Sequence, residues 1–167
     1  SEFSCPINPD VERFLLQSSI EFTKKDQSVT YLVFNQDDAD LVGYFSITIK
    51  PISVLASSLS KSMCRKISRV SVLDEDTNTY TASAYLIAQL GKNFALPIER
   101  RIDGNALLDF ALSNILRAKY FLGGVVEFLE CEDKEPLIKF YTGNGFKIFN
   151  SRITKDNLKL RQLLKFI

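Results

Sequence analysis

The turn RIDGNA, at positions 101–106, is the part of this chain best suited to bind an anion. It follows a strand-like run at 81–91, TASAYLIAQLG, and it opens a segment with a helical pattern. The first amides of a helix have no partner within the helix, so they can donate to an anion. Gly104 has no Cβ and lets the backbone approach such a ligand closely. A second strand-like run, FLGGVVEFLEC at 121–131, follows, so the turn belongs to a βαβ unit.

Acid–base chemistry is restricted to a few residue types, because the chain contains no histidine. This absence excludes Ser-His-Asp and Cys-His nucleophilic sites, and it excludes zinc held by histidine. Proton transfer must therefore use Tyr, Glu, Asp, Cys, Lys or water. An acidic group at the end of the second strand-like run supplies carboxylates. Its members are Glu127, Glu130, Glu132 and Asp133.

The bulk composition is that of one soluble domain. The 167 residues are 46% hydrophobic and carry a formal net charge of +1, so the overall charge does not require nucleic acid or a membrane surface as partner. No apolar run approaches the roughly 20 residues of a membrane span, and no secretory leader is recognisable. The three cysteines are too few and too scattered for a disulfide framework. We expect a cytoplasmic protein with free thiols and no metal.

Two motifs carry a family resemblance. The spacing Arg101-x-x-Gly104-x-Ala106 resembles the Arg/Gln-x-x-Gly-x-Gly/Ala signature of the GNAT family of acyl-CoA-dependent N-acetyltransferases. The sequence FYTGNGF at 140–146 is similar to the second signature of that family, a helix with a Tyr followed by Gly-Phe. Each motif alone is weak, but the two occur in the family's order, separated by one helix and one strand. The resemblance implies a mixed sheet with two splayed parallel strands and acetyl-CoA in the gap between them.

By this resemblance the turn holds the diphosphate of acetyl-CoA. The residues expected there are Arg100, Arg101, Ile102, Asp103, Gly104, Asn105 and Ala106. Main-chain N–H groups would converge on the diphosphate, and the two arginines would add charge-assisted contacts. Asp103 departs from the family pattern, because a carboxylate beside a diphosphate is unfavourable unless it points to solvent. The alternative is an ordinary turn between a strand and a helix.

The end of the strand before the turn is the second expected contact with acetyl-CoA. In the family, main-chain groups just beyond a bulge in this strand bind the pantetheine amides and the thioester carbonyl. The matching residues here are Leu90, Gly91 and Lys92. A glycine inside a strand pattern by itself also indicates a bulge or a close ligand. The alternative is that Gly91 only ends the strand.

Tyr141 matches the residue that often serves the family as general acid. When an amine attacks a thioester, the leaving thiolate must be protonated, and a phenol with a pKa of about 10 can do this. A packed helix aromatic is the alternative. Glu130 or Glu132, directly or through water, is the expected base for the amine, although surface carboxylates would look the same. Cys131 is expected to be structural, because the family usually transfers the acetyl group directly.

The leading hypothesis is an acetyl-CoA-dependent N-acetyltransferase that acts on a primary amine of a small molecule or protein. A toxin that acetylates aminoacyl-tRNA is an alternative, since the layout is similar to the toxin branch of the family. The cations Lys61, Arg65, Lys66 and Arg69 would then meet tRNA phosphates rather than solvent alone. An antitoxin partner or a homodimer would be compatible with this reading. A non-catalytic CoA-binding or interaction module stays open because of Asp103 and Gly143, where relatives often carry Lys.

These residues must be positioned by an α+β fold in one domain, 1–167. A helix should start at Asn8-Pro9 and end near Lys24-Lys25, with Asn8 as N-cap. Strands are expected at 29–35, 41–50, 81–91, 121–131, 146–150 and 158–167, the first two as a hairpin that Pro51 ends. Apolar residues at every fourth position predict an amphipathic helix within 54–70. A helix follows the turn at 101–106, and Asp133 is expected to cap a short helix that Gly143 or Gly145 stops.

Overall fold

The computed structural model describes residues 2–167 and has helices flanking a mixed sheet. This confirms the predicted α+β class. In chain order the elements are α1 (Pro9–Arg13), η1 (Phe14–Ser18), α2 (Ser19–Lys24), β1 (Val29–Phe34), β2 (Leu41–Leu55), η2 (Ala56–Ser58), α3 (Lys61–Ile67), β3 (Leu73–Asp74), β4 (Thr79–Lys92), η3 (Ile98–Arg100), α4 (Gly104–Leu122), β5 (Val126–Glu132), α5 (Glu135–Gly143), β6 (Lys147–Ile153) and β7 (Lys159–Phe166).

The strands of the described residues form one seven-stranded sheet. Its order is β1-β2-β4-β5-β7-β6, and β3 pairs with β4. The pairs β1–β2, β3–β4, β5–β7 and β6–β7 are antiparallel. Helix α4 connects β4 to its neighbour β5, and a crossover of this kind joins parallel strands. The predicted βαβ unit is therefore present.

The chain forms two compact units. One contains the residues up to Thr48 together with Ile87–Ile115, and the other contains Ile49–Leu86 together with Leu116–Ile167. Three elements, β2, β4 and α4, run through both units. The units are thus not consecutive segments of the chain.

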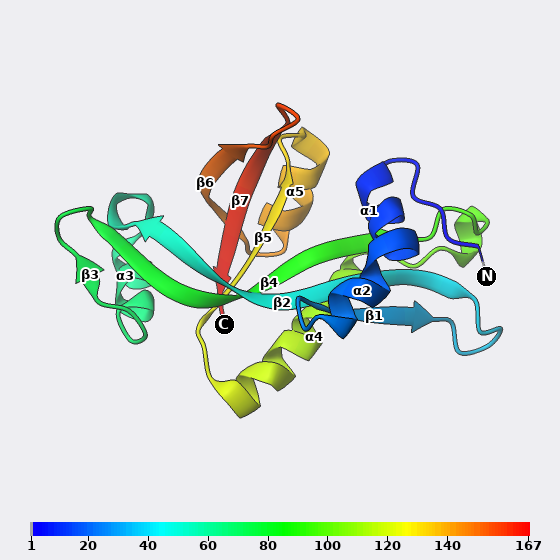
Figure 1. Ribbon diagram of the computed structural model, residues 1–167, viewed down its shortest axis with the longest axis horizontal. Coiled ribbons are helices and arrows are strands. Elements are labelled where there is room, and N and C mark those ends of the chain that lie inside the picture. The colour runs from blue at the N-terminus through cyan, green and yellow to red at the C-terminus, as the bar shows by residue number, and fades with distance from the viewer. Residues whose placement is uncertain (1) are drawn as a thin grey trace. The chain divides into compact units, whose positions relative to one another are not determined.

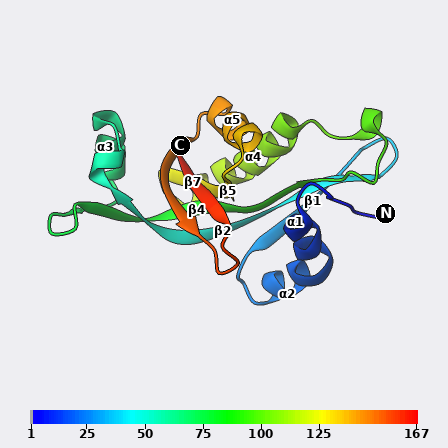
Figure 2. The ribbon, with the colours of Figure 1, turned by 90° about the horizontal axis from the view of Figure 1, so that it is seen from above.

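In the first unit, the N-terminal helices pack beside the β1–β2 hairpin (Figure 2). Asn8 caps α1 as predicted, because its side chain accepts the N–H of Val11. The helix passes through one π-helical segment, η1, before α2 ends at Lys24. Its inner face contributes to a buried cluster, and the Tyr44 hydroxyl donates to the Val11 carbonyl at 2.6 Å. The members of that cluster are Phe3, Cys5, Val11, Leu41 and Tyr44.

In the second unit, β5, β7 and β6 lie side by side, with α5 beside them (Figure 1). A buried cluster of this unit joins α3 to the sheet. That cluster is formed by Ile52, Val54, Met63, Ile67, Tyr80, Ala82, Ala84, Val126, Phe128 and Leu164. Burial of these apolar side chains supplies the driving force that holds α3 on the strands. The helix is capped by Ser60, whose hydroxyl accepts the N–H of Met63.

Several predicted boundaries were wrong. Strand β2 continues through Pro51 to Leu55. The pairing with β1 ends where Val29 of β1 meets Ile47 of β2. Beyond Ile47, β2 has a free edge on the β1 side, and at a free edge the missing N–H of a proline is tolerated. The helix predicted within 54–70 is confined to α3, because its first residues belong to β2 and η2.

The other corrections concern the ends of helices. Phe121 and Leu122 finish α4, so β5 starts only at Val126. Their apolar character is explained by neither strand pairing nor burial, since both side chains are exposed. Asp133 does not cap α5, whose N-cap is Lys134. Its carboxylate instead pairs with Lys159 and Arg161 on β7, both at 2.8 Å.

Candidate active site

The turn before α4 combines main-chain amides that have no partner among the described residues with a side chain that accepts two other amides of the helix start. Helix α4 begins at Gly104, and the carboxylate of Asp103 accepts the N–H of Asn105 at 2.9 Å and that of Ala106 at 3.4 Å. Asp103 is thus an N-cap of the kind that helices commonly have. Among the described residues, the amides of Ile102, Asp103 and Gly104 have no partner. Those three donors remain available to an anion.

The charge of Asp103 is stabilised in this position. The hydrogen bond from the Asn105 amide lowers the pKa of Asp103 most, and the positive charge of Lys92 lowers it further. Lys92 is the last residue of β4, so the strand end and the helix start lie close together. The helix N-terminus therefore holds an anion already, one that belongs to the protein.

The two arginines of the turn are engaged within the first unit. Arg100 pairs with Asp38 and, at 2.7 Å, with Asp40, both in the loop between β1 and β2. Arg101 donates to the carbonyls of Leu96 and Phe94 at 2.8 and 2.9 Å, and its guanidinium stacks on the Phe94 ring. These contacts fold the segment between β4 and α4. The phosphate contacts of the arginines stay a prediction.

The end of β4 is fixed by buried contacts. A Cβ on Gly91 would lie 2.4 Å from Val11 Cγ1 and 2.9 Å from Tyr44 Cε1, so the close neighbour that requires glycine here is the protein itself. The next loop residue, Asn93, is fully buried, and its side chain donates to the carbonyls of Glu2 and Leu41. Leu90, Gly91 and Lys92 thus sit on a rigid strand end. Their contact with a thioester stays a prediction.

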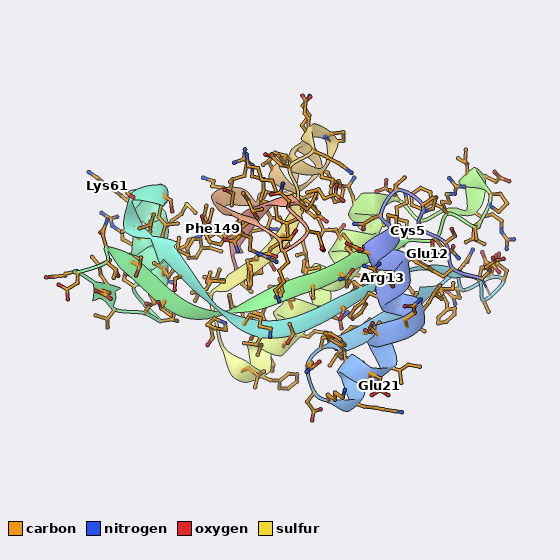
Figure 3. The ribbon with its side chains drawn as sticks, turned by 45° about the horizontal axis from the view of Figure 1, so that its top comes forward. Cys5, Glu12, Arg13, Glu21, Lys61 and Phe149 are labelled. Carbon is orange, nitrogen blue, oxygen red and sulfur yellow. The ribbon has the colours of Figure 1, made fainter. Side chains whose placement is uncertain are left out.

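The N-terminal segment takes part in that anchor. Asn93 also accepts the N–H of Ser4 through its side-chain oxygen at 3.0 Å. The carboxylate of Glu12 accepts the N–H of Cys5 at 2.6 Å, and Figure 3 shows these two residues close together. The first residues of the chain therefore close the unit around the end of β4.

Tyr141 lies on α5 in the second unit, with only 9% of its surface exposed. Its ring meets Phe140 and Phe146 edge to face, at centroid distances of 5.0 and 6.1 Å. Burial, together with nearby Cys131, raises the pKa of the phenol above its ordinary value of 10.0, so the hydroxyl keeps its proton at neutral pH. Among residues 2–167 this hydroxyl has no hydrogen-bond partner. It is thus a protonated donor that no protein acceptor occupies.

The carboxylates proposed as bases are paired instead. Arg152 donates to both oxygens of Glu130, at 2.7 and 2.5 Å, and Gln162 donates to one of them at 2.7 Å. Burial alone would raise the pKa of Glu130, but these donors outweigh it and hold the pKa below its ordinary value. Glu132 pairs with Lys134. A carboxylate whose charge is stabilised in this way is a weak base. Glu130, which has the lowered pKa, is therefore a weak base.

Cys131 lies between these two glutamates on β5. Burial, with the charges of Asp133 and Glu132, raises the pKa of its thiol to about 11. A thiol with this pKa is almost entirely protonated at neutral pH and is a poor nucleophile. Since side chains alternate along a strand, Cys131 and Glu130 point to opposite faces, and Tyr141 is on the Cys131 side.

Glu127 is a titratable group whose burial the sequence did not indicate. It is 1% exposed, and neither carboxylate oxygen has a hydrogen-bond partner among the described residues. The nearest cation, Lys165 Nζ, is 3.8 Å away, and Lys119 contributes a further attraction. Burial outweighs both and raises the pKa of Glu127 to about 7. The sequence VEFLECE could have indicated this burial, because Glu127 and Leu129 are two residues apart and therefore share one face of the strand.

The second unit also contains a cavity of about 420 Å³ that the sequence did not reveal. It lies over β2, β4, β5, β7 and β6 on the face of the sheet that carries Phe128 and Glu130. Its lining residues are Lys50, Pro51, Ile52, Ser53, Leu86, Phe128, Glu130, Phe149, Asn150 and Gln162. Tyr141 is on the other face of β5, so the cavity is not the surroundings of the phenol.

No group of three or more Asp, Glu, Cys or His side chains among residues 2–167 could hold a metal ion. No described helix combines the length and apolar character of a membrane span.

No family model matches this sequence, and no curated protein is significantly similar to it. Solved structures, in contrast, are similar over nearly the whole chain. A bacterial toxin aligns with 99% of this chain and 82% of its own, at 15% identity and a TM-score of 0.68. AtaT complexed with acetyl-methionyl-tRNAfMet aligns over 95% and 84%, at 16% identity and a TM-score of 0.67.

A third structure, a protein assigned to the GNAT family from Desulfovibrio desulfuricans, aligns with 98% of this chain and 83% of its own. Its identity is 15% and its TM-score 0.54. The chain therefore has the GNAT fold, as the two sequence motifs predicted. Identities this low establish the fold alone.

Proposed function

We propose that the protein is an acetyl-CoA-dependent N-acetyltransferase that transfers an acetyl group directly to a primary amine. The observation that carries the proposal is that both motif sites occupy the elements expected in a GNAT fold. The RIDGNA turn follows β4 and η3 and opens α4, and the amides of Ile102, Asp103 and Gly104 have no partner among the described residues. Tyr141 lies on α5, and its protonated hydroxyl has no partner among the described residues either.

The residues present fit acetyl-CoA, with one competitor. The amides of Ile102, Asp103 and Gly104 form a short row of donors at a helix N-terminus, which suits a diphosphate. The Asp103 carboxylate would have to turn away, because it uses the next two amides. When bound, acetyl-CoA supplies an activated acetyl thioester and a thiol leaving group. Leu90, Gly91 and Lys92 would fix the thioester through the rigid end of β4.

Tyr141 is proposed as the general acid. The phenol carries its proton at neutral pH, and this proton has no competing acceptor among the described residues. The proton would pass to the sulfur as the carbon–sulfur bond breaks. For the amine, we propose that Glu130 or Glu132 accepts the proton, directly or through water, with Glu130 weakened as a base by its pairing with Arg152.

Calorimetric titration with acetyl-CoA, followed by a thiol-release assay over a panel of amines, tests this proposal. Binding with turnover on at least one amine, lost in Tyr141→Phe, is the expected outcome. Binding without turnover on any amine would favour a non-catalytic CoA-binding module. No binding of acetyl-CoA would refute both.

A toxin that acetylates aminoacyl-tRNA is the second candidate. One observation that favours it is that the two toxin structures have TM-scores of 0.68 and 0.67, against 0.54 for the third structure. In addition, α3 presents three exposed cations, of which Lys61 is labelled in Figure 3. Lys61, Arg65 and Lys66 have no carboxylate partner among the described residues, so they are available to phosphates.

Expression from a tightly controlled promoter separates the two acceptors. Growth arrest that Tyr141→Phe relieves would support the toxin. Unimpaired growth, with active enzyme demonstrated in the same cells, would contradict it and leave a small-molecule or protein amine as acceptor.

A further inference from the structure

The free strand edges of this chain differ in their protection against pairing with another chain. An edge presents unpaired N–H and C=O groups, and proteins usually block it with a charged side chain, a proline, a bulge or a short length. β6, at one edge of the sheet, carries Lys147 and Arg152 and contains a bulge. The part of β2 beyond Ile47, which β1 leaves unpaired, contains Lys50 and Pro51. Both of these edges are therefore protected.

β1, the edge strand of the first unit, has none of these devices (Figure 1). Its six residues, VTYLVF, include no charged residue and no proline. The register with β2 shifts once, but the extra residue is Val42 of β2, so β1 itself is unbroken. Outside its ladder with β2, the main chain of β1 has no hydrogen-bond partner among residues 2–167. β1 thus presents a continuous row of open main-chain donors and acceptors.

The side chains of β1 are apolar and exposed on both faces of the strand. Val29 and Tyr31 lie on one face, and Leu32 and Phe34 lie on the other. All four side chains are between 38 and 53% exposed. Valine, tyrosine and phenylalanine are favoured in strands because they pack well against their cross-strand neighbours. A strand added at this edge would therefore bury apolar surface on both faces and also pair the open main chain.

The charges around β1 favour a second copy of the same strand in antiparallel alignment. No charged residue lies within β1, so pairing with itself opposes no like charges. An acidic segment follows the strand, with the carboxylates Asp37, Asp38 and Asp40. Arg100 pairs with the last two, so a net negative charge remains at this end. At the other end Lys24 and Lys25 balance Glu21 and Asp26. Antiparallel pairing places the acidic end of each copy beside this neutral end, whereas parallel pairing would place two acidic ends together.

We propose that β1 is a dimerisation edge, at which β1 of a second copy of this chain pairs antiparallel about a two-fold axis. The main-chain groups that point away from β2 then pair with the same groups of the other copy, so one contact closes both open edges. The exposed side chains of the two strands pack against each other on both faces of the extended sheet. This association does not require the proposed acetyltransferase activity.

Analytical ultracentrifugation of the full chain, from low micromolar to near-millimolar concentration, tests the association. We expect a reversible equilibrium between monomer and dimer. Leu32→Lys should raise the Kd of the dimer by on the order of tenfold or more, because it removes an apolar contact and adds the same charge to the pairing edge of both copies. A chain that stays monomeric over the whole range would overturn the proposal.

Ile153→Lys is the matched control, because it also adds a lysine at an exposed apolar position of an edge strand, here β6. The dimer of this variant should have the Kd of the unmodified chain. Circular dichroism shows whether the variants are folded, and Phe34→Lys, at another exposed position of β1, replaces Leu32→Lys if that variant does not fold. A dimer that the substitutions on β1 and β6 weaken equally, or that neither weakens, would place the interface elsewhere and refute β1.

Hydrogen exchange tests the pairing without any substitution. The amides of residues 29–34 that point away from β2 should exchange more slowly at high protein concentration than at low concentration, whereas the amides of β6 should not change. Exchange of all β1 amides that is independent of concentration would contradict pairing at this edge. Protection that appears only when a lysine-flanked VTYLVF peptide is added to a monomeric chain would assign the edge to a foreign strand and exclude the second copy.

Discussion

The carboxylate of Asp103 accepts the N–H of Asn105 at 2.9 Å, so the helix that should receive a diphosphate is capped by an anion of the chain itself. This capping lowers the pKa of Asp103 and stabilises its charge where a second anion would have to bind. A diphosphate would thus compete with Asp103 for the amides of Asn105 and Ala106. The competition is electrostatic as well as geometric.

Replacement of Asp103 by Asn should therefore strengthen the binding of acetyl-CoA. Asn caps helices about as well as Asp, so α4 stays intact while the negative charge is lost. We expect the Kd to fall by roughly five- to tenfold at low ionic strength, with a smaller gain at high salt. Calorimetry at two salt concentrations measures both. Asp109→Asn, an exposed carboxylate further along α4, is the matched control and should change little.

An unchanged or weaker affinity of Asp103→Asn would mean that Asp103 does not compete with acetyl-CoA. A cap that contributes directly to cofactor binding would give that result.

Tyr141→Phe should lower kcat by on the order of 10²-fold and leave acetyl-CoA binding unchanged. The substitution removes one hydroxyl, which makes no hydrogen bond within the described residues, so packing against Phe140 and Phe146 is preserved. Single-turnover acetylation of a responsive amine measures the chemical step. Tyr120→Phe, at an 85% exposed position on α4, controls for the loss of a phenol. If both variants keep full kcat, Tyr141 is not the acid.

Glu127 should make the protein less stable as the pH rises. Its pKa is about 7 in the folded protein and 4.5 in an ordinary environment, so the folded state holds the extra proton between these values. The stabilisation is present below pH 4.5 and is lost as the pH rises to about 7, by up to about 3 kcal/mol in the free energy of unfolding. Glu127→Gln should remove this dependence.

Urea unfolding at pH 5 and pH 8 measures the effect. The Gln variant should be more stable than the unmodified chain at pH 8 and similar to it at pH 5. Glu135→Gln, which changes an exposed carboxylate on α5, should show no such pH difference. A parallel pH dependence of Glu127→Gln and the unmodified chain would show that Lys165 and Lys119 already neutralise the buried charge.

Local signals in the sequence predicted most of the fold. Asn8-Pro9 started the first helix, the βαβ order was correct, and both motifs fell on the expected elements. The role of Asp103 could have been read as well, because Asp is a favoured N-cap and the helical pattern starts at Gly104. The extension of β2 through Pro51 could not, since it depends on where the partner strand β1 ends.

The cavity and the state of the acidic residues depend on contacts distant in sequence. Glu130 is paired by Arg152, 22 residues away, and its partner Gln162 is 32 residues away. Neither spacing is a motif. The bulge at Phe149 follows from the register of β6 against β7, which no local pattern in FKIFN specifies. A motif therefore indicated the helix that carries Tyr141, whereas no motif indicated the pairing of Glu130.

Gly91→Ala should destabilise the first unit, because the tight contact at this glycine comes from packing. The new Cβ would lie 2.4 Å from Val11 Cγ1 and 2.9 Å from Tyr44 Cε1, and the Tyr44 hydroxyl is tied to the Val11 carbonyl. The Tyr44 ring cannot move away without straining that bond, and Val11 is itself buried. We expect a loss of about 1–3 kcal/mol in the free energy of unfolding.

Gly143→Ala is the matched comparison. A Cβ there meets no atom within 4 Å, and Gly143 is the last residue of α5. That substitution should be neutral or stabilise the chain by up to about 1 kcal/mol, as alanine favours helix more than glycine. Thermal unfolding of the two variants at one pH compares them directly. If Gly91→Ala were as stable as Gly143→Ala, the strand end would be loose enough to shift, and the rigid placement of Leu90 to Lys92 beneath a thioester would have to be abandoned.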